Sequence, residues 1–121
     1  MRTLVLISSL WLLLVASAGA GEADVVDVVA RPESGSTWRF DVTLRHSDTG
    51  WDHYADRWDV MTPDGKVLGS RVLLHPHVNE QPFTRSLGGV AIPAGVTRVR
   101  LRGHDKVHEL GGIELEVELK P

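Results

Sequence analysis

The 121 residues of this sequence contain no cysteine. Disulfides, thiolate metal centres, a cysteine nucleophile and the lipid-modified cysteine of a lipoprotein are therefore all excluded. Beyond residues 1–20 the sequence also lacks any long apolar run, and nowhere in that part do we find the periodicity of a long helix. Stability must come from packing, alone or together with a bound metal ion.

The one long apolar stretch is the amino-terminal segment, residues 1–20, MRTLVLISSLWLLLVASAGA. A positive charge at Arg2, an apolar core over residues 4–15 and small residues at the end predict a secretory signal peptide, cleaved after Ala20 or two residues earlier. A membrane anchor is the alternative, but a spanning helix needs about 20 apolar residues and this core is shorter. We therefore expect a secreted or periplasmic protein, residues 21–121, with no membrane attachment after cleavage.

The predicted mature domain is mildly acidic. The whole chain has 13 Lys and Arg against 16 Asp and Glu, and one of the positive charges, Arg2, belongs to the predicted leader. This balance argues against nucleic acid or anionic lipid as the main partner. Residues 21–121 are long enough for one hydrophobic core and too short for two, so we expect a single domain.

Alternation of apolar and polar residues dominates this domain and predicts strands. In STWRFDVTLRH, one face carries Trp38, Phe40, Val42 and Leu44. Similar patterns predict strands at residues 24–31, 36–46, 55–62, 66–75, 83–92, 97–103 and 113–119, of which the fifth is weak. The segment TPDG at 62–65 predicts a tight turn between the third and fourth. Together these features indicate an all-β, seven-stranded, two-sheet immunoglobulin-like β-sandwich.

The last two predicted strands carry opposite charges at matching spacing. Pairing them as an antiparallel hairpin sets each of three arginines opposite a glutamate, in the pairs Arg102–Glu114, Arg100–Glu116 and Arg98–Glu118. Such exposed cross-strand pairs contribute roughly 0.2–1 kcal/mol each. We interpret these six residues as structural.

Three quoted stretches carry a resemblance to known proteins. The segment IPAGVTRVRLRGHD, residues 92–105, looks like the start of the sixth strand of immunoglobulin or fibronectin domains. The block from TLRHSDTGWDHYADRWDV through VLLHPHVNEQPFTRSL, residues 43–87, resembles a family of small exported bacterial proteins of unassigned function. The resemblance implies a β-sandwich and export, and it transfers no functional residue.

All histidines of the sequence are predicted to lie at one end of the sandwich. If successive strands run in alternating directions, the second, fourth and sixth strands finish at the end where the third strand begins. The six histidines then share that end, together with the mature amino terminus: His46, His53, His75, His77, His104 and His108. Loops at one end of such sandwiches are commonly used for binding.

Clustered imidazoles make a metal site the leading hypothesis. His75 and His77 flank Pro76 and are expected to point to the same side of an extended backbone, which suits two ligands on one ion. His104 and His108 form a second pair, whereas His46 is equally well explained as a hydrogen-bonded cover on the core. His53 either binds metal or orients a neighbouring aspartate. In the absence of thiolates, the expected ion is Zn or Cu(II).

No catalytic signature is present. We find no G-x-S-x-G, no H-E-x-x-H and no phosphate-binding loop, so the leading hypothesis is a non-enzymatic metal-binding domain. A small metallohydrolase remains an alternative, because an open coordination position is not visible in sequence. A second alternative is an interaction module, in which Trp51, Tyr54 and Phe83 form an aromatic patch for a protein partner.

Overall fold

Seven strands and their connecting turns make up the domain. The computed structural model describes residues 21–121, and the predicted leader, residues 1–20, lies outside the described residues. The strands are β1 (Asp24–Pro32), β2 (Thr37–Arg45), β3 (Ala55–Met61), β4 (Val67–Val72), β5 (Phe83–Ala91), β6 (Arg98–Asp105) and β7 (Leu115–Glu118). Among residues 21–121 we find no helix with the length and hydropathy needed to cross a bilayer.

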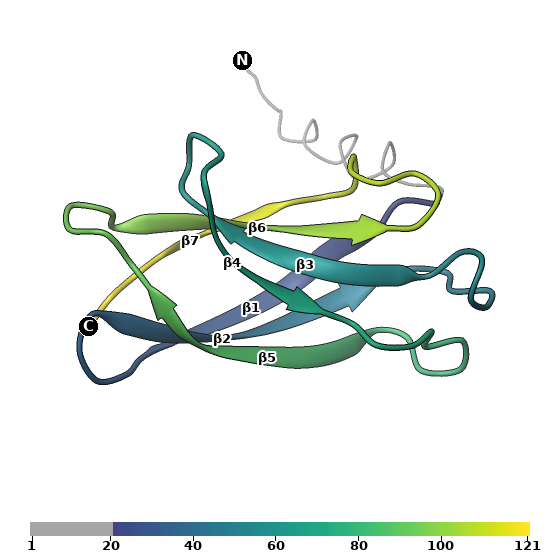
Figure 1. Ribbon diagram of the computed structural model, residues 1–121, viewed down its shortest axis with the longest axis horizontal. Coiled ribbons are helices and arrows are strands. Elements are labelled where there is room, and N and C mark those ends of the chain that lie inside the picture. The colour runs from purple at the N-terminus through teal and green to yellow at the C-terminus, as the bar shows by residue number, and fades with distance from the viewer. Residues whose placement is uncertain (1–20) are drawn as a thin grey trace, which may run out of the picture.

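The strands form two antiparallel sheets that pack face to face (Figure 1). One sheet has the order β1-β2-β5 and the other the order β4-β3-β6-β7. The chain crosses from β4 back to the first sheet, where β5 pairs with β2. This arrangement confirms the predicted all-β, seven-stranded, two-sheet sandwich, and it shows that the weak fifth strand is a full strand of nine residues.

Alternate residues of the two sheets fill the space between them. Phe40, Val42 and Leu44 of β2 are fully buried, as the alternation predicted, while Trp38 is partly buried at the edge of the core. The opposing sheet contributes a second fully buried set, which consists of Ala55, Trp58, Val60, Val99 and Leu101. Because full burial of one such large side chain contributes about 1.5–3 kcal/mol, these two sets hold the sheets together without disulfides.

The predicted turn between β3 and β4 is confirmed. The amide of Thr62 donates to the Lys66 carbonyl at 2.8 Å, and the amide of Gly65 donates to the Thr62 carbonyl at 2.9 Å. Gly65 has a φ of 99°, a conformation that a residue without Cβ adopts at low cost. The fourth strand is shorter than predicted: it ends at Val72 rather than His75, and its last pair with β3 joins Val72 to Arg57.

The charged hairpin of β6 and β7 has the predicted register for two of its three pairs. Arg98 lies opposite Glu118, and Arg100 lies opposite Glu116. The pairing of Arg102 with Glu114 was wrong, because β7 begins after Glu114. Arg102 instead donates from Nε to Asp59 on the neighbouring strand β3, at 2.9 Å.

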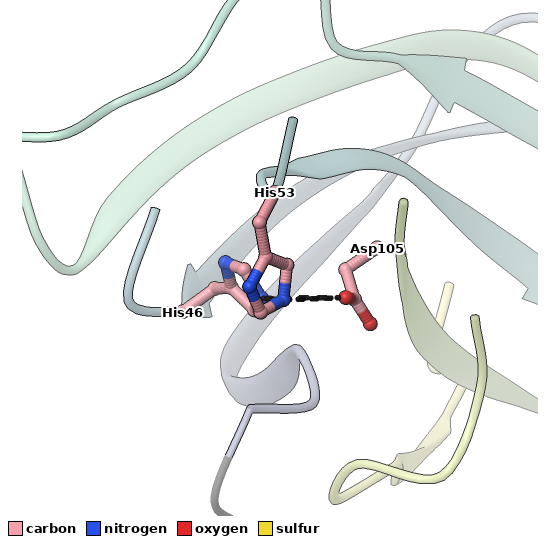
Figure 2. Close-up of side chains that lie close together, drawn as sticks. All are labelled: His46, His53 and Asp105. Carbon is pink, nitrogen blue, oxygen red and sulfur yellow. Dashed lines mark hydrogen bonds and ion pairs between the residues drawn. The ribbon is translucent and has the colours of Figure 1, made fainter. Parts of the chain in front are cut away.

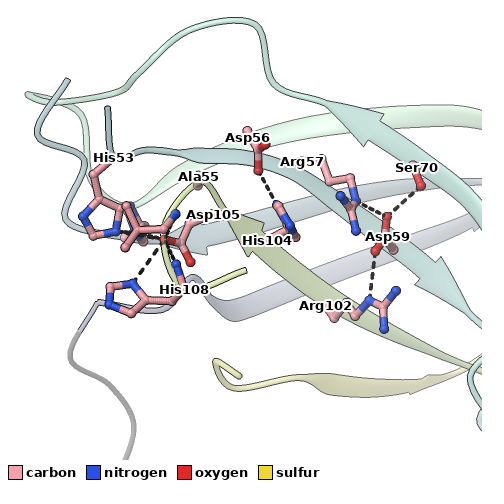
Figure 3. Close-up of polar contacts among 12 residues, drawn as sticks. His53, Ala55, Asp56, Arg57, Asp59, Ser70, Arg102, His104, Asp105 and His108 are labelled. Carbon is pink, nitrogen blue, oxygen red and sulfur yellow. Dashed lines mark hydrogen bonds and ion pairs between the residues drawn. The ribbon is translucent and has the colours of Figure 1, made fainter. Parts of the chain in front are cut away.

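Asp59 is a buried carboxylate on the outer side of the second sheet (Figure 3). It accepts hydrogen bonds from Ser70 Oγ at 2.7 Å, from Arg57 Nε at 3.0 Å and from Arg102 Nε at 2.9 Å. Burial alone would raise the pKa of Asp59, but these hydrogen bonds and the charge of Arg57 outweigh it and hold the pKa below its usual value. The carboxylate therefore joins β3, β4 and β6 as an anion.

We predict that Asp59→Asn destabilises the domain at neutral pH and much less in acid. A carboxyl whose pKa is lower in the folded state stabilises the fold above the unfolded-state pKa, about 3.9, and loses that contribution as pH falls below it. Urea unfolding of both proteins at about pH 7 and about pH 3 measures this difference. A difference in unfolding free energy that is the same at both pH values would contradict the assignment.

Candidate metal centre

Three side chains from three segments converge at the end of the sandwich where β2 and β6 finish (Figure 2). His46 directly follows β2, His53 lies in the connection from β2 to β3, and Asp105 is the last residue of β6. One ligand atom of each, two ring nitrogens and a carboxylate oxygen, lies within 4.8 Å of the other two. We call these three residues the His-His-Asp group.

Strand alternation places two members of the group in the interior. His46 continues the inward-facing positions of β2, and Asp105 continues those of β6, so that both side chains have no exposed surface. His53 reaches them because a turn folds its connection back, with the His53 amide donating to the Gly50 carbonyl at 3.2 Å. The His53 side chain is 22% exposed and forms the solvent side of the group.

The distances within the group match those around a small metal ion. His46 Nε2 and His53 Nε2 are 3.2 Å apart, and Asp105 Oδ2 lies 2.8 Å from the second nitrogen and 3.6 Å from the first. A circle through three atoms at these separations has a radius of about 1.9 Å, against Zn–N bonds of about 2.0–2.1 Å. An ion slightly outside their plane would therefore meet all three at bonding distance.

A buried carboxylate orients the first of these ligands. Asp48 Oδ1 lies 2.5 Å from His46 Nδ1, and the same oxygen accepts the Ala55 amide at 3.1 Å. Asp48 Oδ2 accepts the His77 amide at 2.7 Å. A carboxylate on the far nitrogen is the usual partner of a metal-binding histidine, because it fixes the ring orientation and makes the other nitrogen a better donor.

Asp105 is held as an anion by its own loop. Its Oδ2 accepts the amides of Val107 at 3.1 Å and His108 at 3.0 Å, as aspartate does in turns. Burial would raise the pKa of Asp105, but these backbone hydrogen bonds, a further one from the His108 ring and the nearby His46 together lower it. Asp105 Oδ1 is buried and has no hydrogen-bond partner among the described residues.

A neutral His46 presents a lone pair, and not an N–H group, to the rest of the His-His-Asp group. Because His46 Nδ1 faces the Asp48 carboxylate, the proton of a neutral His46 ring belongs on that nitrogen. Its Nε2 then directs a lone pair at the Gly21 carbonyl oxygen, 3.0 Å away, and at Asp105 Oδ2. Neither oxygen is a donor, so this lone pair is satisfied either by an N–H of His53, whose Nε2 is 3.2 Å away, or by a metal ion.

His108 lies beside the group without belonging to it. Its Nδ1 is 3.2 Å from Asp105 Oδ2, and its ring centroid is 5.0 Å from that of His53 (Figure 3). It is nevertheless outside the set of ligand atoms that all lie within 4.8 Å of one another. The predicted pairing of His108 with His104 does not occur, because His104 is on the strand β6 and donates from Nδ1 to Asp56 at 2.6 Å.

The His75-Pro76-His77 motif lies at the same end but outside the group. The rings of His75 and His77 are close, with centroids 4.7 Å apart, as two ligands would need. However, His77 is buried against Phe83, with ring centroids 3.9 Å apart, and its Nε2 accepts a hydrogen bond from Arg85 at 2.9 Å. Burial first, and the Arg85 charge second, lower the pKa of His77. The Arg85 guanidinium therefore occupies Nε2 of His77, whereas Nδ1 is buried without a hydrogen-bond partner among the described residues.

All six histidines thus share one end, and the structure brings His46, His53 and the neighbouring His108 together, but not the other three. Two contributors were missed from the sequence, namely Asp48 and Gly21. Asp105 was not among the predicted ligands, although extending the alternation of β6 by two residues would have placed it inward.

Comparison with known proteins gives the fold and no activity. No protein-family model matches the chain. The chain is 47% identical over 97 residues to a protein of Halomicrobium mukohataei named "Putative lipoprotein". That alignment covers 80% of this chain and 47% of the relative, so the chain spans about half the length of the curated protein it matches.

A likeness in shape extends over most of the domain. A crystal structure of a hypothetical protein from Pyrococcus horikoshii OT3 superposes with a TM-score of 0.50 at 14% sequence identity, covering 88% of this chain and 99% of that chain. At this identity the likeness shows the fold alone. Neither protein's name assigns a biochemical function, and neither names an immunoglobulin-like family.

We predict that Asp48→Asn destabilises the domain in the absence of metal. An amide has one acceptor oxygen where the carboxylate serves three donors, so at least one buried donor loses its partner, at a cost of about 1–3 kcal/mol. Thermal unfolding should show a melting temperature lower by several degrees. The matched control is Asp52→Asn in the same connection, where the side chain is exposed and no change is expected. Equal effects of the two substitutions would contradict the role of Asp48.

Proposed function

We propose that this domain binds one divalent transition metal ion, Zn(II) or Cu(II), through His46 Nε2, His53 Nε2 and the Asp105 carboxylate. The observation that carries the proposal is the convergence of three ligand atoms, separated by 2.8 to 3.6 Å, around a point at bonding distance from each. The role we propose is capture or transfer of the ion by an exported, non-enzymatic protein.

The donor atoms favour these two ions. Two imidazoles and one carboxylate suit Zn(II) and Cu(II), and the sequence offers no thiolate that would select Cu(I). Met61, the methionine of the described residues, is buried at the end of β3 that is paired with Arg100, away from the group. Two histidines with one carboxylate also bind Fe(II) in some enzymes, so Fe(II) belongs among the ions tested.

The surroundings of the group support binding rather than catalysis. Asp105 supplies a negative charge that offsets part of the ion's charge, and Asp48 strengthens His46 as a donor. Gly21 and His108 also lie against the group, and together with the partly exposed His53 they separate its two buried members from solvent. The leader-like residues 1–20 and the name of the Halomicrobium protein support an exported location.

A second candidate function, recognition of a protein partner, is favoured by Trp51 alone. Its side chain is 66% exposed in the connection that also carries His53. The other two residues of the predicted aromatic patch are buried: Tyr54 lies under Trp51, with ring centroids 5.6 Å apart, and Phe83 stacks on His77. Trp51 is therefore a candidate contact for a protein that delivers or receives the ion.

We predict that Zn(II) or Cu(II) in excess raises the melting temperature of the domain. An ion present at about 100 times its dissociation constant stabilises the fold by about 2.7 kcal/mol, which corresponds to about 10 °C or more for a domain of this size. His46→Ala and His53→Ala should each abolish the shift. Differential scanning fluorimetry with Zn(II), Cu(II), Ni(II) and, without oxygen, Fe(II) measures it.

Three further substitutions test whether the shift depends on the His-His-Asp group or on neighbouring residues. His75→Ala and His104→Ala remove exposed or outward-facing imidazoles at the same end, and we expect both to keep the full shift. Trp51→Ala should also keep it, because Trp51 contacts no member of the group through a polar atom. The absence of a shift with every ion, or its loss in His75→Ala and not in His46→Ala, would contradict the proposed site.

A further inference from the structure

The first described residue, Gly21, lies directly against the His-His-Asp group. Its carbonyl oxygen is 3.0 Å from His46 Nε2, close to the spacing between the group's own ligand atoms. Cleavage after Ala20, one of the two sites that the sequence predicts, would make Gly21 the amino terminus. Gly21, which lies beside the group, is therefore the residue whose amide nitrogen would become an amine on cleavage.

We propose, on the basis of the proposed function, that cleavage after Ala20 completes the metal site by supplying the α-amino nitrogen of Gly21 as a ligand. Signal-peptidase hydrolysis consumes one water molecule, breaks the Ala20–Gly21 peptide bond and leaves a carboxylate on Ala20 and a free amine on Gly21. The amine releases its extra proton to solvent and directs its lone pair to the ion. Together with the Gly21 carbonyl oxygen, it closes a five-membered chelate ring.

The close packing at this position explains why it carries a glycine. A Cβ placed on Gly21 would lie 2.9 Å from His108 Nε2, closer than real Cβ atoms approach, so the His108 ring would have to shift. The backbone also has a φ of 98°, which favours glycine. His108 thereby covers Gly21 from outside, and its hydrogen bond to Asp105 holds this cover in place. We assign His108 this positioning role rather than direct coordination.

The chemistry of the amine makes binding depend on processing. Before cleavage the Gly21 nitrogen is an amide, whose lone pair is delocalised into the carbonyl and does not bind Zn(II) at neutral pH. After cleavage it is an amine with an ordinary pKa of about 7.7–8.0, from which an ion readily displaces the proton. Binding would then be weaker before cleavage than after it, so the unprocessed chain would retain less metal inside the cell.

Zn(II) affinity tests the inference directly. All seven strands lie within residues 21–121, so forms that begin at Ala20 and at Gly21 both contain the whole sandwich. Loss of one supporting residue around a metal already costs about 10–100-fold in affinity, so we expect the form beginning at Gly21 to bind Zn(II) at least about tenfold more tightly. Calorimetric titration of both forms measures the ratio. Equal affinity would overturn the inference and leave the three-ligand site standing, whereas no binding by either form would contradict the proposed function itself.

Two readouts independent of affinity complete the test. The full 121-residue chain, expressed in an exporting host, should yield a mature protein whose mass corresponds to a start at Gly21, and a different start overturns the inference. The Cu(II) complex of that protein, labelled with ¹⁵N-glycine, should show a changed nitrogen hyperfine pattern in electron paramagnetic resonance. An unchanged pattern would mean that no glycine nitrogen binds the ion, and His108→Ala should preserve the labelled coupling while weakening binding.

Discussion

The buried carboxylate of Asp48 connects the segments on which the histidine-bearing end depends. One oxygen accepts His46 Nδ1 and the Ala55 amide, and the other accepts the His77 amide. These donors belong to the end of β2, the start of β3 and the connection between β4 and β5, so a single anion ties both sheets together. It also decides which nitrogen of His46 faces the group, and therefore what the group can bind.

Burial of Asp48, Asp105 and His46 side by side is costly in a small domain without disulfides. Removing charged groups from water is repaid only when their hydrogen bonds and charges are well matched. Asp48 is fully matched by donors, whereas Asp105 keeps one buried oxygen without a partner and His46 Nε2 faces acceptors. A metal ion bound by these atoms would supply the missing positive charge, which gives the arrangement a physical reason beyond packing.

Alternation along the strands was sufficient to predict the fold and the end at which the histidines gather. Strand direction alone placed all six histidines at one end, in agreement with the observed topology, but it did not single out His46, His53 and His108. The surroundings of His77 could not be predicted in the same way, because stacking on Phe83 and the hydrogen bond from Arg85 depend on the neighbouring strand β5. Spacing within one strand contains no information on such neighbours.

The candidate site could be predicted only in part from the sequence, because its residues also depend on contacts between segments. The alternation of β6 places Asp105 inward only if the strand extends to that residue. Where the strand ends depends on its pairing with Ala55 of β3. Asp48 and Gly21 carried no signal, since one acts through hydrogen bonds between three segments and the other through its backbone. The motif that stood out in the sequence contributes a backbone amide, which supports the carboxylate that orients His46.

The central claim is that one ion binds at the His-His-Asp group. A crystal structure of the mature protein grown with Zn(II), with anomalous diffraction recorded on both sides of the zinc absorption edge, tests it most directly. We predict one strong anomalous peak about 2.0–2.2 Å from His46 Nε2, His53 Nε2 and an Asp105 carboxylate oxygen. A peak between His75 and His77, or no peak at the group in zinc-saturated crystals, would contradict it.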